Sequence, residues 1–206
     1  TRFPRYGFFS DFYPGDDAAA KARELAKFHI NAVQFYDWMW THDRLVPYHQ
    51  GQPANIFRTM ANNPQLWRSY LRLGNGLWNQ SGLDVPTREL VILRTAILHH
   101  SLYEWHQHVR LGRQAGLSDA RIVALHHWRT SDLFTEPERA LLGYVDALAA
   151  SDHPFDEAHN TLAAHFDKST IVGVNLLTGF YAMTAKFLGA MEVETEEPFI
   201  GWQLNG

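Results

Sequence analysis

The sequence predicts an all-α domain preceded by a short N-terminal extension of different character. Apolar residues recur at helical spacing through most of the chain, for example at Leu90, Leu93 and Ile97. The capping-box pattern, a serine or threonine followed three residues later by glutamate, occurs at Ser101 and again at Thr135. Repeated helix starts separated by short connections indicate a fold built from helical hairpins.

Composition limits the class of protein. The chain has 206 residues, of which 46% are hydrophobic, which is enough to bury a core as one domain or one domain plus an extension. Its net charge is -4 and it has no lysine or arginine block, so we expect no nucleic-acid or membrane partner. No apolar run reaches membrane-spanning length and the N-terminus lacks a signal-peptide core, so a cytoplasmic location is the default expectation. The chain contains no cysteine, which excludes disulfides.

Helix signals are densest between residues 86 and 128. They predict a helix over residues 86–99, a turn near His100, a second helix over residues 101–113 and a short third helix ending near Trp128. The acidic tail, residues 192–197, is expected to be solvated.

Three ionisable residues in this segment are the candidate catalytic groups. Glu104 and His108 are four positions apart and therefore share a helix face. A carboxylate beside an imidazole favours the charged ring, which gives a proton donor near neutral pH. On one straight helix Glu89 would stand about 22 Å from Glu104, but the predicted turn allows the two to face each other.

These residues also have structural alternatives. Glu104 can act solely as the capping-box partner of Ser101, and Glu89 can occupy the favourable first turn of its helix. His100, Glu104 and His108 have the spacing of metal ligands, but the turn near His100 interrupts their common face. We therefore expect no metal site and no other cofactor.

Several motifs carry a family resemblance: Arg88-Glu89-Leu90, Tyr103-Glu104-Trp105, His108-Val109-Arg110 and the run from Ala115 to Asp119. They resemble the carboxymuconolactone decarboxylase family, which includes the alkylhydroperoxidase D-like proteins. The resemblance implies an alkylhydroperoxidase D-like helical domain over residues 49–206, association into a homo-oligomer, and a pocket for a small-molecule substrate. The candidate substrate-binding residues are Ser101, Tyr103, Trp105 and Tyr181.

The cysteine pair of the peroxidase branch is missing. The resemblance places those cysteines at positions 101 and 104, where this chain has Ser101 and Glu104. A thiol peroxidase needs a thiolate and a resolving thiol, so a self-sufficient peroxidase is excluded. The decarboxylase branch implies lyase or isomerase chemistry on a small organic acid or lactone, with His108 transferring a proton, Glu104 setting its charge and Glu89 assisting. The alternative is a catalytically inactive oligomeric binding or scaffold relative.

Residues 1–48 have a different pattern, with strands predicted at 5–10 and 31–36 and a helix at 16–28. The run Val33 to Trp38, with Arg5-Tyr6-Gly7 before it, resembles the opening of the barrel in the dextranase and cycloisomaltooligosaccharide glucanotransferase family. The stretch lacks the paired acids of a glycosidase, so no such activity transfers. Three explanations stay open: an extension packed on the helical domain, a fused gene fragment, or a helical segment whose resemblance is accidental. Residues 47–53 are the expected linker.

Overall fold

The computed structural model describes residues 6–8, 32–34, 54–150 and 155–196 of the chain. The chain divides into two compact units, Thr1–Pro47 and Tyr48–Gly206. In the first unit, strands β1 (Tyr6–Phe8) and β2 (Ala32–Gln34) pair in parallel, with Tyr6 opposite Ala32. Both predicted strands are therefore present. The helix expected at 16–28 and the linker expected at 47–53 lie outside the described residues.

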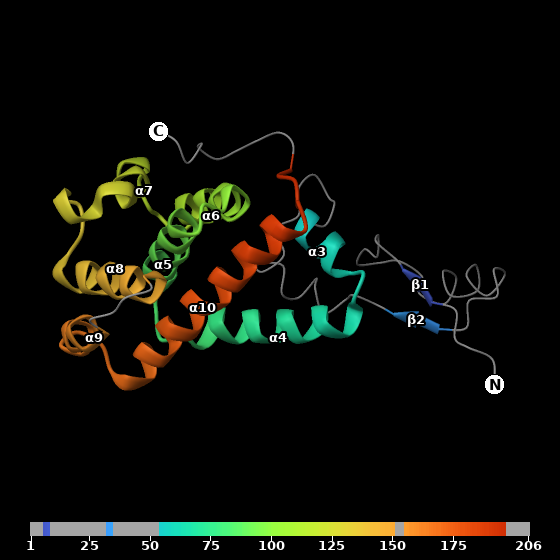
Figure 1. Ribbon diagram of the computed structural model, residues 1–206, viewed down its shortest axis with the longest axis horizontal. Coiled ribbons are helices and arrows are strands. Elements are labelled where there is room, and N and C mark those ends of the chain that lie inside the picture. Colours follow the sequence, from blue (N-terminus) through green and yellow to red (C-terminus); the bar gives the residue numbers. More distant parts are fainter. Residues whose placement is uncertain (1–5, 9–31, 35–53, 151–154, 197–206) are drawn as a thin grey trace. The chain divides into compact units, whose positions relative to one another are not determined.

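The described part of the second unit is helical, which confirms the predicted fold class (Figure 1). Its elements are α3 (Asn55–Met60), α4 (Pro64–Gln80), α5 (Val85–Leu98), α6 (Leu102–Gln114), α7 (Asp119–Ala124), the 3₁₀ helix η1 (Leu125–Thr130), α8 (Glu136–Ala149), α9 (Phe155–Ala163) and α10 (Lys168–Ala190). The short helix expected to end near Trp128 is divided into α7 and η1. The backbone at His127 leaves the helical region, with φ of -133°.

Side-chain caps explain where several of these helices begin. Asp84 accepts a hydrogen bond from the backbone N–H of Thr87 at 2.9 Å and so starts α5. At α8, Thr135 and Glu138 form a complete capping box. These short-range bonds satisfy first-turn N–H groups that have no partner within the helix.

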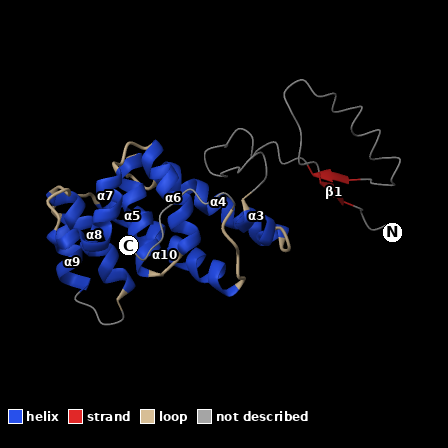
Figure 2. Cartoon of the chain, turned by 90° about the horizontal axis from the view of Figure 1, so that it is seen from above, coloured by secondary structure: helices blue, strands red, loops and turns tan. Residues whose placement is uncertain are grey.

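Helix α5 is the centre of the packing. It contacts α6, α8, α10 and η1, and Figure 2 shows it enclosed among its neighbours. One side of α5 contributes Val91 and Ile92 to an apolar cluster with α8 and α10. Its other side contributes Leu90 and Leu93 to a second cluster with α6 and α7. Burial on both sides fixes the position of α5, and thereby of any polar group that it carries.

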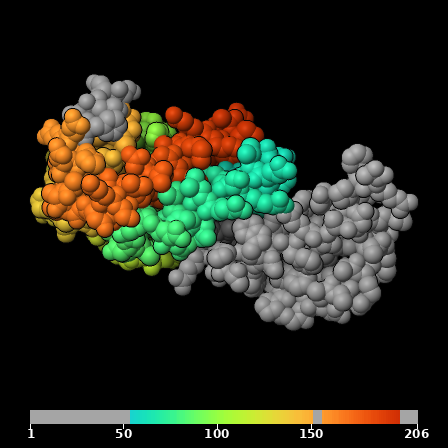
Figure 3. Space-filling view, turned by 90° about the horizontal axis from the view of Figure 1, so that it is seen from below, coloured from blue at the N-terminus to red at the C-terminus, as the bar shows by residue number. Residues whose placement is uncertain are grey.

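Helices α4 and α10 run antiparallel and lie side by side across one face of the unit (Figure 3). The hydroxyls of Tyr70 and Thr184 bond at 2.9 Å, whereas Ser81, at the other end of α4, lies against Gly173. Among the described helices, α10 is the one long and apolar enough to cross a membrane by length and composition. Just over half of its most apolar window, 56%, is buried in the protein, as in a core helix.

Gly173 tests this close approach of α10 to the end of α4. A Cβ atom at Gly173 would overlap the backbone carbonyl of Ser81, whereas at Gly179 of the same helix nothing lies within 4 Å. We expect Gly173→Ala to lower the free energy of unfolding by about 1–3 kcal/mol through overpacking. The control Gly179→Ala should raise it by up to about 1 kcal/mol, the difference in helix propensity. Urea denaturation measures both, and a neutral Gly173→Ala would contradict the packing.

Candidate active site

A buried carboxylate–imidazole pair joins α5 to α6. Glu89 Oε2 lies 2.7 Å from His108 Nδ1, and the two side chains are only 1% and 8% exposed. Since a carboxylate oxygen accepts, His108 donates from Nδ1. In the neutral ring this leaves the lone pair on Nε2, so the pair has the geometry of an oriented proton acceptor.

The predicted turn makes this contact possible. Ser101 N–H bonds the carbonyl of Ala96 at 2.9 Å, and His100 N–H bonds that of Ile97 at 3.1 Å, which ends α5. His100 takes φ of +52°, a left-handed conformation in which glycine is more common. The chain therefore reverses within three residues, and α6 returns along α5 with His108 opposite Glu89.

Arg88, which is itself held by Trp78, bonds the other oxygen of Glu89. Arg88 donates from one terminal nitrogen to Glu89 Oε1 at 3.3 Å and from the other to the carbonyl of Trp78 at 2.8 Å. Its guanidinium carbon also lies 4.1 Å from the centroid of the Trp78 ring. Each oxygen of the Glu89 carboxylate thus faces a cationic or titratable donor, which offsets the cost of burying it.

Tyr181 of α10 lies against the imidazole. Its ring meets the His108 ring edge to face, with centroids 5.0 Å apart, and its hydroxyl accepts from Trp78 Nε1 at 2.9 Å. Burial raises the pKa of Tyr181 well above its usual value, and the nearby charge of Glu89 raises it further. Tyr181 is therefore a neutral phenol at physiological pH.

Glu104 differs from Glu89 in having no hydrogen-bond partner for its carboxyl. Its residue is 3% exposed, and neither carboxyl oxygen has a partner among the described residues. Burial raises the pKa of Glu104 well above its usual value. The carboxyl is therefore held toward its neutral form, which can donate a proton.

The capping box predicted at Ser101 is only half formed. The Ser101 hydroxyl accepts from the backbone N–H of Glu104 at 3.4 Å, but the Glu104 carboxyl makes no bond in return. The ring of His108 is hydrogen-bonded to Glu89, across two helices, whereas the sequence had assigned its neighbouring charge to Glu104. Tertiary packing of α5 against α6 decides between these two carboxylates.

Of the other predicted site residues, some lie at the Glu89–His108 pair and others lie away from it. Tyr181 contacts the Glu89–His108 pair, and Ser101 caps α6 one turn before Glu104. Tyr103 directs its hydroxyl to Glu196, at 2.6 Å. Trp105 is buried in the apolar cluster of α6 and α7, where its ring meets that of His126. The structure therefore brings Glu89, His108 and Tyr181 together, but not Trp105.

Sequence reasoning missed Trp78 and Arg88 as parts of this site. Arg88 directly precedes Glu89, but side chains at adjacent helix positions point in different directions. Only the fold shows that the Arg88 guanidinium bonds the Glu89 carboxylate. Trp78 comes from α4 and carries no motif of its own. Within the described residues, no group of three histidine, aspartate or glutamate side chains has a metal-binding arrangement.

Comparison with known families finds one match in each part of the chain. Residues 64–147 match the carboxymuconolactone decarboxylase family, and residues 1–73 match glycosyl hydrolase family 66. Both resemblances predicted from the sequence are thus confirmed, and the first match lies within the helical unit. The glycosyl hydrolase match extends past residue 48 and ends within α4.

Individual relatives support the same division. The chain is 41% identical over 71 residues to a cycloisomaltooligosaccharide glucanotransferase of Niallia circulans, a match that covers 32% of this chain and 7% of that enzyme. It is 32% identical over 121 residues to the uncharacterized protein YnjA of Escherichia coli (strain K12), covering 57% of this chain and 65% of YnjA. The chain thus spans less than two thirds of each of these relatives.

A solved structure aligns with the helical unit over nearly the whole length of the solved protein. It is ATU0492 of Agrobacterium tumefaciens, a protein of unknown function assigned provisionally to the antioxidant defence protein AhpD. It aligns with a TM-score of 0.64 and 29% identity over 67% of this chain and 95% of its own. The helical unit therefore has an alkylhydroperoxidase D-like fold, as the sequence predicted.

Glu104 makes protein stability depend on pH in a direction that can be tested. The folded protein keeps the Glu104 proton at pH values where the unfolded chain, with the ordinary pKa of 4.5, has released it. This contribution to stability is full below pH 4.5 and is lost as pH rises, by up to about 1.4 kcal/mol per pH unit. The free energy of unfolding of Glu104→Gln lacks this loss, so we expect it to rise relative to that of the wild type as the pH is raised from 5 to 8.

Urea denaturation at both pH values measures this difference. Glu194→Gln is the matched control, because this residue is exposed and the hydrogen bond that it accepts from Asn55 is to its backbone carbonyl. It should leave the pH dependence unchanged. Parallel pH dependences for Glu104→Gln and the wild type would contradict the neutral buried carboxyl.

Proposed function

We propose that this chain carries out cofactor-independent acid–base chemistry, of the lyase or isomerase kind, on a small organic acid or lactone. The observation that carries the proposal is the buried Glu89–His108 pair, 2.7 Å apart, with the unpartnered carboxyl of Glu104 one turn before His108 on α6. This arrangement supplies a base and a separate acid in one water-poor region.

His108 is the proposed base. Glu89 holds the proton on Nδ1 and orients the ring, so that Nε2 can take a proton from the substrate. As the ring becomes positively charged, the Glu89 carboxylate stabilises it directly. Arg88 keeps that carboxylate in place through its bond to the other oxygen. The sequence-based mechanism gave this charge-setting role to Glu104, and the hydrogen bonding supports Glu89 instead.

Glu104 is the proposed acid. In a decarboxylation, the bond between the carboxylate carbon and its neighbour breaks, carbon dioxide leaves, and the electron pair stays on the remaining carbon as an enolate. A neutral Glu104 can protonate that carbon and then recover its proton from solvent. In an isomerisation, His108 removes one proton from the substrate and Glu104 adds one elsewhere. His108 then releases its proton to solvent and Glu104 takes one up, which restores both groups. Both reactions balance without a metal, thiol or redox partner.

A catalytically inactive scaffold is the alternative, and the surface of α4 and α10 supports the oligomer that this role requires. Five large apolar side chains are about half exposed or more on these two adjacent helices: Leu66, Leu73, Val172, Leu176 and Met183. On each helix they recur at intervals of four or seven, which places them in one stripe. A stripe of this kind suits packing against a second copy of the chain, so a homo-oligomer is part of both proposals.

The His108→Ala variant separates the two proposals. Removing a general base lowers turnover about 10²- to 10⁴-fold, so we expect a loss of that size with small lactones bearing a carboxylate. Carbon dioxide release and proton NMR of the products measure decarboxylation and isomerisation, respectively. His165→Ala, at an exposed histidine beyond α9, is the control and should retain full turnover.

If wild type and His108→Ala turned over the same substrates equally well, the assignment of the base would be wrong. If no carboxylated lactone or organic acid were converted by the wild type while the protein stayed oligomeric, the scaffold alternative would replace the enzyme.

A further inference from the structure

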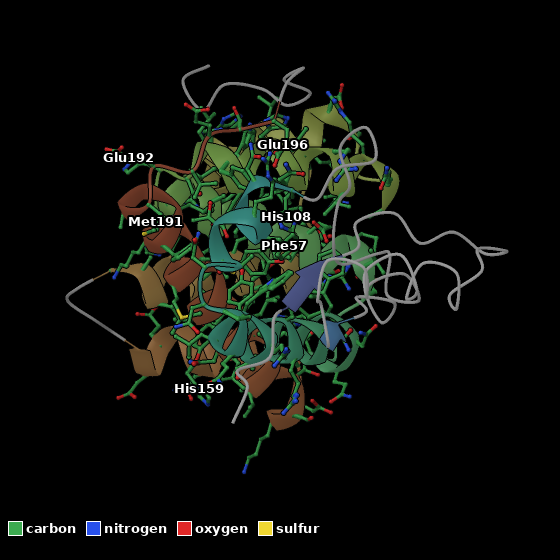
Figure 4. All side chains as sticks on the ribbon, turned by 90° about the vertical axis from the view of Figure 1, so that its right-hand side faces the viewer. Phe57, His108, His159, Met191, Glu192 and Glu196 are labelled. Carbon is green, nitrogen blue, oxygen red and sulfur yellow. The ribbon has the colours of Figure 1, made fainter. Side chains whose placement is uncertain are left out.

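We propose that Glu196, in the segment after α10, is a positioning residue that fixes α6 and through it His108 and Glu104. The sequence predicted this acidic tail to be solvated, but Glu196 is only 7% exposed. Its role toward His108 rests on the function proposed above. Figure 4 shows Glu196 and His108 in the same part of the helical unit, together with Phe57 of α3.

Glu196 supplies the cap that α3 lacks. The residue before this helix is Ala54, which has no side chain able to accept a hydrogen bond. The first N–H of the helix, from Asn55, donates instead to Glu196 Oε1 at 2.6 Å. Asn55 also donates from its side chain to the backbone carbonyl of Glu194 at 3.0 Å. A residue 141 positions later in the chain thus caps α3.

The same carboxylate holds α6 at two points. Tyr103 donates its hydroxyl proton to Glu196 Oε1 at 2.6 Å, and Gln107 Nε2 donates to Glu196 Oε2. Tyr103 in turn accepts from the N–H of Ile56, the second residue of α3, at 3.2 Å. Three donors therefore converge on one buried carboxylate and tie α3, α6 and the C-terminal segment together.

This contact lies beside the candidate active site. Tyr103 and Gln107 are one turn apart on α6, and each is followed directly by an active-site residue, Glu104 and His108, respectively. Because a helix moves as a unit over one turn, a shift of Tyr103 and Gln107 displaces the next two side chains as well. Glu196 also follows α10, whose Tyr181 meets the His108 ring, so it closes a ring of contacts around the pair.

The donors and acceptors around Glu196 allow a swap experiment. In Glu196→Gln, one carboxylate oxygen is replaced by an amide NH₂ group, which must face a hydrogen-bond donor. Depending on the orientation of the amide, this donor is the NH₂ group of Gln107, or the Tyr103 hydroxyl together with the Asn55 N–H. Adding Gln107→Glu places an acceptor opposite the new amide NH₂ group. The carboxylate at position 107 can also accept from Arg110, which in the wild type donates to the Gln107 side-chain oxygen at 3.4 Å. The double variant has the same composition as the wild type, with the donor and the acceptor exchanged.

We expect Glu196→Gln to raise the amide hydrogen-exchange rates of Asn55 and Ile56 about 10- to 100-fold, through loss of a charge-assisted bond. The imidazole ¹⁵N resonances of His108 should shift in the same variant. In Glu196→Gln/Gln107→Glu, both readings should return toward the wild type. Glu194→Gln is the control and should change neither.

Three results would overturn the proposal. If amide exchange at Asn55 and Ile56 were unchanged in Glu196→Gln, Glu196 would not be the cap of α3. Faster exchange with unmoved His108 resonances would make Glu196 a helix cap without influence on the site. If the exchange rates and His108 resonances of the double variant were no closer to the wild type than those of Glu196→Gln, the matching of donors and acceptors around Glu196 would not matter. None of these readings requires turnover, so they are independent of the proposed reaction.

Discussion

The hydrogen bond between Glu89 and His108 is the constraint on which the candidate site depends. Glu89 is fully buried on α5, and a carboxylate there needs partners to offset its desolvation. His108 and Arg88 provide them, one on each oxygen. The need to satisfy this group sets how α6 lies against α5, and it orients the imidazole at the same time. The same contact therefore orders the two helices and is the basis of the proposed chemistry.

The two carboxyl groups of the site acquire different properties from their surroundings. Glu89 is bonded on both oxygens, whereas the Glu104 carboxyl is buried without a hydrogen-bond partner in the described part of the chain and is held toward its neutral form. Enzymes that use one acid and one base near pH 7 separate two similar groups in this way. The family resemblance implies that the peroxidase branch has a cysteine at the position of Glu104, and this chain departs from that branch there. The fold is thus retained while the chemistry available to it differs.

Local signals predicted most of the helices but only part of the site. Asp84, Ser101 and Thr135 act through bonds within three residues, so their helix starts are visible in the sequence. The choice of Glu89 over Glu104 as the partner of His108 depends on how α5 and α6 pack, which no local pattern encodes. Glu196 is 89 residues from Gln107, and its acidic neighbours gave it the pattern of a solvated tail.

The most direct test of the account is ¹⁵N NMR of the His108 imidazole in the wild type and in Glu89→Gln. The account predicts that the neutral ring carries its proton on Nδ1, in a hydrogen bond, with Nε2 unprotonated. Replacing the carboxylate should shift both resonances, because the acceptor that fixes the tautomer is weakened. A wild-type ring protonated on Nε2, or resonances unaffected by Glu89→Gln, would contradict the pairing on which the proposed base depends.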